Sequence, residues 1–515
     1  MTKLSGWKLA YAVSLFCVWT AIAANAQTSE LPNRTLSPGS GERGRQSATA
    51  GNKHIAPRFT NLANFEWNNG LFPSTSLIQS RDGKAFGVTP AGGNSEFGSI
   101  FEITPGGGLT SLHSFYDDVN GGGPSDLIQV NNGDFYGTTA SGGANLGGTV
   151  FKLSREGTLT TLYNFCDQPN CIDGEDPRAP LVQGIDGDFY GTTYFGGDNG
   201  YGTVFRITPA GSLTTLHSFN FSTDGQGSTG LVQASNGTFY GTTEYGGPNS
   251  GGNDLCYLGC GTTFAMTSDG TFTTLYDFCG QPTCEDGYHP YGGLMQALDG
   301  NLYGTAVGGG NPSCKSPYGC GTVFKITPSG SLTTIHRFND TDGANPYGSL
   351  IEAIDGNLYG TTAAGGFENR GTIFRITSDG TLTTVYRFSG RYGVYPYGGL
   401  LQGTNGIFYG TTEQGGDYSC NDHSGCGTVF SLDVGLGPFV AFVRDSGKAG
   451  GTGGILGQGF TGATGVSLNG TPASFTVVSD TFLKATVPAG ATTGYATVTT
   501  PTGTLTSNVP FHVIR

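Results

Sequence analysis

Between residues 59 and 434, short apolar runs alternate with Gly-rich polar stretches, and the same order of runs returns many times. Each unit reads Phe-Tyr-Gly-Thr-Thr, then Gly-Gly, then Gly-Thr-Val-Phe-x-Ile-Thr, then Leu-Thr-Thr-Leu-Tyr-x-Phe. Phe86 replaces the first Tyr in a degenerate first copy, and that Tyr recurs at Tyr136, Tyr190, Tyr240, Tyr303, Tyr359 and Tyr409. A nearly fixed period of about 50 to 63 residues is typical of stacked or circular repeat proteins.

The unit around Tyr240 indicates what each repeat forms. Apolar and β-branched runs separated by Gly, Asn and Asp predict four short strands, at 230–234, 239–243, 261–267 and 272–278. Asn236-Gly237 predicts a two-residue hairpin turn of type I′ between the first two strands. Four short antiparallel strands per unit favour one propeller blade per unit.

The number of strands tests whether the repeat closes into a ring. The third strand of the unit occurs seven times and last at 427–432, but the fourth strand follows it only six times. The missing strand lies before the first unit, at 59–65, so we expect it to complete the last sheet with Leu62 near Val429. A closed ring would use the leading strand in this way, because its pairing with the last sheet removes two exposed sheet edges. We therefore predict an all-β fold with a seven-bladed propeller over 59–434; an open β-array is the alternative.

The units resemble a known family of repeats. The segments Phe239-Tyr240-Gly241-Thr242-Thr243, Gly246-Gly247 and Gly202-Thr203-Val204-Phe205 are similar to the choice-of-anchor tandem repeats called GloVer repeats. The resemblance covers about 59–434 and implies an exported bacterial protein. It brings no catalytic residues that could be transferred to this chain.

The C-terminal part, 437–515, changes in character. Cysteine disappears, Thr and Val become frequent, and the repeated phrase stops. Gly459-Phe460, the Asn469-Gly470 hairpin and Val487-Pro488-Ala489-Gly490 make this part similar to the IPT/TIG family of immunoglobulin-like sandwiches. The resemblance implies a small β-sandwich that serves as a spacer or interaction module.

The N-terminal sequence indicates the compartment of the protein, and the net charge limits the classes of partner that it can bind. Residues 1–26 resemble a cleaved signal peptide, with Lys3 and Lys8 before an apolar run and Ala24-Asn25-Ala26 at its end. The polar stretch 27–58 predicts a disordered lead. The net charge of −14 disfavours nucleic acid and anionic membranes as partners. We expect a secreted or cell-surface protein, a monomer, with no membrane span once the signal is removed.

Ten cysteines follow the signal and fall into close pairs. An even number in an exported chain predicts disulfides. The pairs are Cys166/Cys171, Cys256/Cys260, Cys279/Cys284, Cys314/Cys320 and Cys420/Cys426. The alternative for two neighbouring pairs, Cys256/Cys260 with Cys279/Cys284, is a four-thiolate zinc site. We expect disulfides and no metal site.

The two faces of the predicted ring differ in their connections. One face has uniformly tight turns such as Asn236-Gly237, whereas the other has longer connections of variable length that carry every cysteine pair. Binding groups usually lie on loops held by a rigid scaffold, so we place the ligand site on the long-connection face. The candidates are Asp173, Asp176, Asp224, Asp286, Asp342, Tyr291, Tyr347 and Tyr397. Ringed carboxylates could hold Ca²⁺, and carboxylates beside aromatic faces could hold a sugar; turn formation and packing are the alternative roles.

Two functions from different classes remain. The first is a non-enzymatic binding or scaffold protein, without a cofactor, whose ligand is a glycan or a protein. The second is a polysaccharide-active hydrolase or lyase that uses acids at the channel mouth. No nucleophile elbow, metalloprotease helix or phosphate loop occurs in the sequence, so we favour the binding protein.

Overall fold

The computed structural model describes residues 56–514, apart from 250–255, 257, 282, 316–317 and 422. The expected signal peptide and nearly all of the expected lead lie outside these residues. Helix is scarce in the described chain: it consists of α2 (Asp117–Asn120) and the 3₁₀ turns η1 (Pro169–Cys171) and η3 (Gly390–Tyr392). None of the described helices is long and apolar enough to cross a membrane. The fold is therefore all-β, as predicted.

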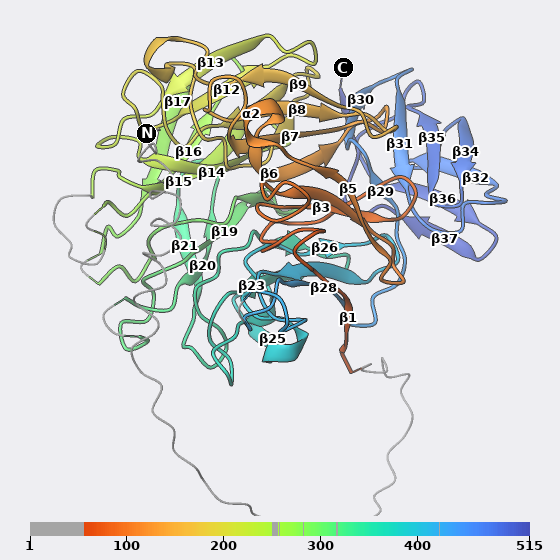
Figure 1. Cartoon of the computed structure of the whole chain (residues 1–515). Helices are drawn as coiled ribbons and strands as arrows, with labels where there is room; N and C mark the ends of the chain where they lie inside the picture. The colour runs from red at the N-terminus through yellow and green to blue at the C-terminus, as the bar shows by residue number, and fades with distance from the viewer. Residues whose placement is uncertain are drawn as a thin grey trace, which may run out of the picture. The chain divides into compact units, whose positions relative to one another are not determined.

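Four-stranded antiparallel sheets, each resembling a propeller blade, make up the repeat region (Figure 1). The first three sheets are β2 (Ile78–Gln79), β3 (Ala85–Thr89), β4 (Ser99–Ile103) and β5 (Leu109–Ser114); β6 (Gly122–Gln129), β7 (Phe135–Ser141), β8 (Thr149–Leu153) and β9 (Leu159–Asn164); and β10 (Val182–Gln183), β11 (Phe189–Thr192), β12 (Thr203–Ile207) and β13 (Leu213–Ser218). The next three are β14 (Gln226–Gln233), β15 (Phe239–Tyr245), β16 (Thr262–Met266) and β17 (Phe272–Asp277); β18 (Met295–Gln296), β19 (Leu302–Ala306), β20 (Thr322–Ile326) and β21 (Leu332–Arg337); and β22 (Ile351–Glu352), β23 (Leu358–Thr362), β24 (Thr372–Ile376) and β25 (Leu382–Arg387).

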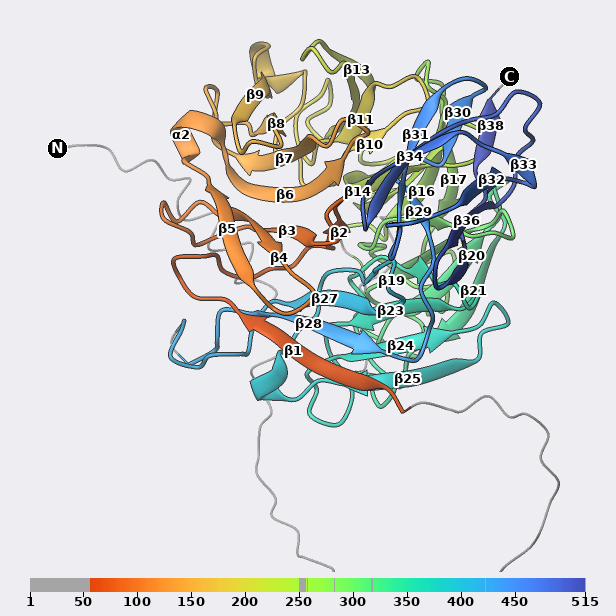
Figure 2. The same ribbon diagram turned by 90° about the vertical axis from the view of Figure 1, so that its right-hand side faces the viewer.

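The last sheet of the repeat joins the two ends of the region. Its strands are β26 (Leu401–Gln402), β27 (Phe408–Thr412), β28 (Thr428–Asp433) and, as its outer strand, β1 (Arg58–Asn64). Strand β1 is antiparallel to β28, with Ala63 opposite Val429 and a bulge at Leu62 (Figure 2). The expected pairing of the leading segment with the trailing sheet is confirmed.

Hydrophobic cores lie between successive sheets. Leu127, Phe135 and Phe151 pack with Phe86 and Ile100 of the preceding sheet, and equivalent clusters join each later pair along the chain. A further cluster joins the β1–β28 sheet to the β2–β5 sheet, where Val429 and Phe65 share a core with Phe101. Because each sheet buries both faces against neighbours, the inner strands are apolar on both sides.

One packing contact explains why this Gly and this Phe recur in every unit. In every unit the Gly after the first Tyr lies beneath the ring of the Phe in Gly-Thr-Val-Phe. At Gly360 an added Cβ would lie 2.6 Å from Cζ of Phe374 and 2.8 Å from Cδ2 of Leu350. Only a residue without a side chain fits at this close approach. The Gly is therefore a packing requirement of each sheet.

We expect Gly360→Ala to destabilise the protein by about 1–3 kcal/mol, because the added methyl overpacks a full core. The matched control is Gly437→Ala, since no atom lies within 4 Å of a Cβ there and Gly437 is exposed. Urea unfolding followed by tyrosine fluorescence measures both variants. Equal midpoints for the two variants would contradict the packing explanation.

The repeated Thr residues tie the two inner strands together. Thr139 Oγ1 of β7 lies 2.9 Å from Thr149 Oγ1 of β8 and accepts a hydrogen bond from the backbone N–H of Thr149. The same hydroxyl pair recurs in other sheets, for example between Thr362 and Thr372. These hydroxyls are fully buried, so each needs such a partner.

The turn at Asn236-Gly237 differs from the prediction. Gly237 has a φ of 84°, whereas Asn236 does not have a positive φ, and a type I′ turn needs positive φ at both residues. The amide of Gly237 donates to the Ala234 carbonyl and the amide of Ala234 to the Thr238 carbonyl. The connection is therefore a three-residue loop with a left-handed Gly. By contrast, Asn469 and Gly470 both have positive φ.

The C-terminal residues form two further four-stranded sheets (Figure 1). The first is β29 (Ala441–Phe442), β31 (Thr452–Leu456), β35 (Phe482–Thr486) and β34 (Phe475–Ser479), and the second is β33 (Thr471–Pro472), β32 (Gly465–Leu468), β36 (Ala496–Thr500) and β37 (Gly503–Thr506). Strands β30 (Ser446–Lys448) and β38 (His512–Ile514) form a parallel pair. Buried Val466 and Val498 of the second sheet pack on Ile455 and Leu483 of the first.

Candidate functional site

The tight-turn face is partly covered by the C-terminal sheets. Thr481 donates a hydrogen bond of 2.6 Å to the Arg81 carbonyl beside one turn, and the Arg81 guanidinium lies 4.5 Å from the ring centre of Phe482. Arg444 donates to the Gly184 carbonyl at another turn. A Cβ on Gly406, in a third turn, would lie against the Leu436 carbonyl. These contacts leave the long-connection face as the place to look for a ligand site.

All five expected disulfides occur on the long connections. They join Cys166 to Cys171, Cys256 to Cys260, Cys279 to Cys284, Cys314 to Cys320 and Cys420 to Cys426. Each closes a short loop, so each contributes about 2 kcal/mol or less by chain entropy. The disulfides therefore brace the connections locally.

Four of the candidate acids are bound within their own connections. Asp173 accepts hydrogen bonds from the Tyr163 hydroxyl at 2.9 Å and from the Asp167 amide at 3.0 Å. Asp286 accepts in the same way from the Tyr276 hydroxyl at 2.8 Å and the Gly280 amide at 3.3 Å. Both carboxylates are almost fully buried. Each acid thus links the fourth strand of its sheet to the loop that follows.

Histidine replaces tyrosine as the partner in two other units. His217 Nε2 lies 2.7 Å from the Asp224 carboxylate, and His336 Nε2 lies 3.1 Å from that of Asp342. This pairing explains why one register of the fourth strand accepts either Tyr or His, since both can donate to the loop acid. The fifth candidate, Asp176, pairs with Arg178 at 2.5 Å. Asp173 and Asp176 share the connection between β9 and β10, whereas Asp224, Asp286 and Asp342 each lie in a different connection.

The three candidate tyrosines lie together. The ring centres of Tyr291 and Tyr347 are 5.2 Å apart, and those of Tyr347 and Tyr397 are 4.9 Å apart, both edge to face. Each follows a proline and precedes the first strand of its sheet, so three consecutive sheets present one ring each. Tyr291 is 43% exposed. We call Tyr291, Tyr347 and Tyr397 the tyrosine row.

Two glutamates that sequence reasoning missed accompany the tyrosine row. Glu244 and Glu413 are half-buried, and burial raises the pKa of each carboxyl to about 7. Burial, together with the charges of Glu244 and Glu413, raises the pKa of the Tyr291 hydroxyl to about 12. The two carboxyls and the tyrosine row therefore share one electrostatic environment, although they come from different sheets.

One cationic group belongs to the same environment. The Arg178 guanidinium lies 4.2 Å from the ring centre of Tyr194, and the Tyr194 hydroxyl lies 3.5 Å from a Glu244 carboxylate oxygen. The Arg178 charge lowers the pKa of Glu244 and of Tyr291, opposing the effect of burial. The site thus combines flat aromatic faces, two carboxyls that can hold protons near neutral pH, and one guanidinium.

A sequence signal for the two glutamates does exist. Both follow the repeated Gly-Thr-Thr directly, at a position that is Pro90, Ala140, Tyr194, Val307 and Ala363 in the other units. A charged residue occupies this position only in these two of the seven units, which distinguishes the two glutamates from the uncharged residues elsewhere. Comparing the units position by position would have found both glutamates.

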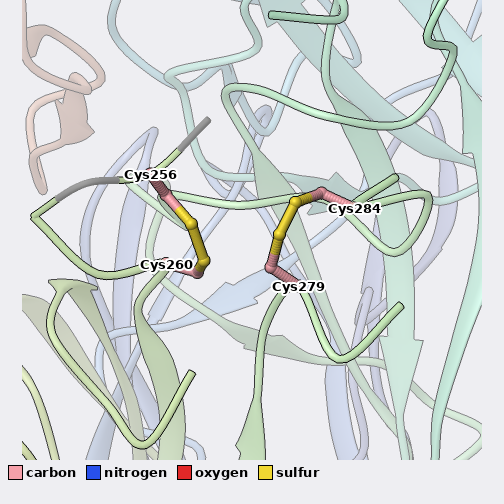
Figure 3. A group of neighbouring side chains, drawn as sticks. All are labelled: Cys256, Cys260, Cys279 and Cys284. Carbon is pink, nitrogen blue, oxygen red and sulfur yellow. A yellow bond between two sulfur atoms is a disulfide. The ribbon is translucent and has the colours of Figure 1, made fainter. Parts of the chain in front are cut away.

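Two of the disulfides form a compact group. The sulfur atoms of Cys256, Cys260, Cys279 and Cys284 all lie within 4.8 Å of one another, and all four residues are buried (Figure 3). The four residues come from two connections of a single blade-like sheet, one between β15 and β16 and one after β17.

The fold and this site define an all-β protein built from repeated four-stranded sheets, with its disulfide-braced connections on one face. A family model, the Gloeobacter/Verrucomicrobia repeat, matches residues 112–253 and 254–478, which is more than half of the chain. The chain belongs to this repeat family. The predicted repeat identity is confirmed. The comparison with curated proteins finds no match.

Several solved structures have a similar arrangement at low identity. The extracellular domain of a putative hybrid two-component system from B. thetaiotaomicron is 11% identical, with a TM-score of 0.44; the match covers 84% of this chain and 50% of that one. The extracellular domain of a putative one-component system from the same organism is 10% identical, with a TM-score of 0.47 and coverage of 89% and 58%. A putative 6-phosphogluconolactonase from Bacteroides fragilis is 20% identical, with a TM-score of 0.40 and coverage of 60% and 82%. The chain spans about half the length of the first of these structures.

Proposed function

We propose that residues 59–434 form a seven-bladed β-propeller closed by β1, followed by an immunoglobulin-like sandwich of the IPT/TIG type over 437–515. The succession of cores from sheet to sheet, and the core that joins the last sheet to the first, support the propeller. The two facing sheets with one apolar core support the sandwich. The five disulfides support export to an oxidising compartment, secreted or at the cell surface.

The proposed function is non-enzymatic binding of a glycan at the tyrosine row. The observation that carries it is the contact of three tyrosine rings from consecutive sheets beside two carboxyls and a guanidinium. Aromatic faces cover the apolar faces of sugar rings, while carboxyl and guanidinium groups hydrogen-bond to hydroxyls. The four internally bonded acids then support the site by holding the connections in place.

Substitution of the central tyrosine tests this proposal. Because Tyr347 contacts both neighbouring rings, we expect Tyr347→Ala to weaken glycan binding about ten-fold or more, the scale of one lost aromatic anchor. An array of plant and microbial glycans identifies the ligand, and calorimetric titration with that oligosaccharide measures the affinity.

The matched control is Tyr495→Ala in the C-terminal sheets, because Tyr495 is 43% exposed, like Tyr291. This variant should bind as the wild type does. Binding that is equal in all three proteins, or a wild type that binds nothing on the array, would contradict the proposal.

Three further expectations stay predictions: Ca²⁺ binding by the loop acids, a protein ligand and a monomeric state.

One observation favours a second candidate, a polysaccharide-active hydrolase. Glu244 and Glu413 come from different sheets, and a carboxyl with a pKa of about 7 can act as a general acid near neutral pH. Hydrolysis would need a carboxyl pair about 5–10 Å apart on either side of the glycosidic bond. Product formation from a polysaccharide panel, abolished in Glu244→Gln and in Glu413→Gln, would establish this function in place of simple binding.

A further inference from the structure

The group of four cysteines differs from every other cysteine pair in the described chain. Cys256 and Cys260 are 2% and 0% exposed, and Cys279 and Cys284 are 8% and 0% exposed. Their sulfur atoms all face one point, where the two disulfides lie side by side (Figure 3). Among the described residues, no other disulfide brings its sulfurs within this distance of a second disulfide.

The spacing of these cysteines is that of a metal site. Three residues separate Cys256 from Cys260, four separate Cys279 from Cys284, and eighteen lie between the two pairs. Structural zinc sites use two Cys pairs with about two to four residues within each pair and about 15–20 between them. By contrast, five residues separate the cysteines of the Cys314/Cys320 and Cys420/Cys426 pairs.

The distances between the four sulfurs also suit tetrahedral coordination of a metal ion. A Zn–S bond of about 2.3 Å places the four sulfurs of a tetrahedron about 3.8 Å apart. The four sulfurs already lie within 4.8 Å of one another. Once the S–S bonds are open, small side-chain rotations therefore suffice to bring them to the tetrahedral separation. We propose that Cys256, Cys260, Cys279 and Cys284, when reduced, form a closed structural site for one Zn²⁺ ion.

The backbone around the ligands is held independently of the sulfurs. The Gly259 amide donates to the Cys256 carbonyl at 2.7 Å, and the His289 amide donates to the Cys260 carbonyl at 2.9 Å. The Gly287 amide donates to the Cys284 carbonyl at 3.0 Å. These bonds persist when the disulfides open, so the four thiols stay convergent, as a preformed metal site requires.

The two states are related by a balanced reaction. A tertiary phosphine and one water convert each disulfide into two thiols: phosphorus is oxidised to the phosphine oxide, and two electrons and two protons reach the sulfurs. The four thiols then bind Zn²⁺ as thiolates and release four protons. The same sulfurs therefore serve either as two disulfides or as one zinc site.

The test uses the whole mature chain, reduced with a tertiary phosphine under inert gas, loaded with Zn²⁺ and freed of excess metal. Elemental mass spectrometry should find one zinc per chain. In Cys279→Ser/Cys284→Ser the zinc affinity should fall at least about a hundred-fold, more than the loss of an outer-shell partner causes. The matched control, Cys314→Ser/Cys320→Ser, should keep its zinc. Cobalt in place of zinc should give the visible spectrum of a tetrahedral thiolate complex.

A second measurement does not depend on the variants folding. Alkylation of the reduced wild type, mapped by peptide mass spectrometry, should show that zinc protects these four thiols and no others. Reduced wild type without bound zinc, or uniform alkylation of all cysteines with zinc present, would overturn the proposal. So would zinc that remains in Cys279→Ser/Cys284→Ser, which would place the ion at Cys166, Cys171 and Glu175 instead.

Discussion

Phe65→Ala is expected to lower the free energy of unfolding by about 3–5 kcal/mol, the cost of removing a buried phenyl ring. Phe65 is 0% exposed, and its ring centre lies 4.9 Å from that of Phe101, edge to face. Its amide donates to the Gly427 carbonyl at 2.9 Å. The side chain therefore stabilises the junction at which the leading segment, the last sheet and the first sheet meet.

Equilibrium unfolding in urea, with the disulfides intact, measures this effect. The matched control is Phe367→Ala, since Phe367 is 93% exposed and its loss should change stability by less than about 0.5 kcal/mol. Phe65→Leu should recover most of the loss, because it refills most of the volume. A loss below about 1 kcal/mol for Phe65→Ala would mean that the leading segment does not stabilise the closed arrangement.

The pair Glu244 and Glu413 should make stability fall as the pH rises. In the unfolded chain these carboxyls ionise near a pKa of 4.5, whereas burial raises the pKa of each to about 7 in the folded protein. Between these values the folded state holds protons that the unfolded state has lost. Stability therefore decreases from about pH 4.5 to pH 7 and is unaffected by these groups below that window.

A shift of one pKa unit corresponds to about 1.4 kcal/mol. Each glutamate should therefore lower the free energy of unfolding by about 3 kcal/mol above pH 8. Glu244→Gln and Glu413→Gln should therefore each raise stability at pH 8 by up to this amount and leave it nearly unchanged at pH 4. Thermal and urea unfolding at the two pH values checks this. Glu66→Gln, at an exposed position, is the control. A gain that is equal at both pH values would refute the burial argument.

The role of the acids in the long connections could not be decided from the sequence. The sequence places Asp173 and Asp286 in loops of the same kind, where ligand binding and loop bracing look alike. The hydrogen bonds from Tyr163 and Tyr276 distinguish the two roles, because they occupy the carboxylates with partners inside the protein. Such pairings depend on side-chain directions across a connection, which no spacing rule specifies.

The repeat, its four-strand unit and the closing strand were determined by the sequence alone. Periodicity of apolar residues and turn formers is a local property, and the missing fourth strand after Asp433 needed only the strand 58–64 to complete it. The tertiary structure alone decided that the tyrosine row lies beside Glu244 and Glu413, which come from different units. It also decided how closely the four sulfurs of the two connections flanking β16 and β17 approach one another. The grouping of the tyrosine row with the two glutamates arises from the packing of one sheet on the next, which brings together residues far apart in the chain.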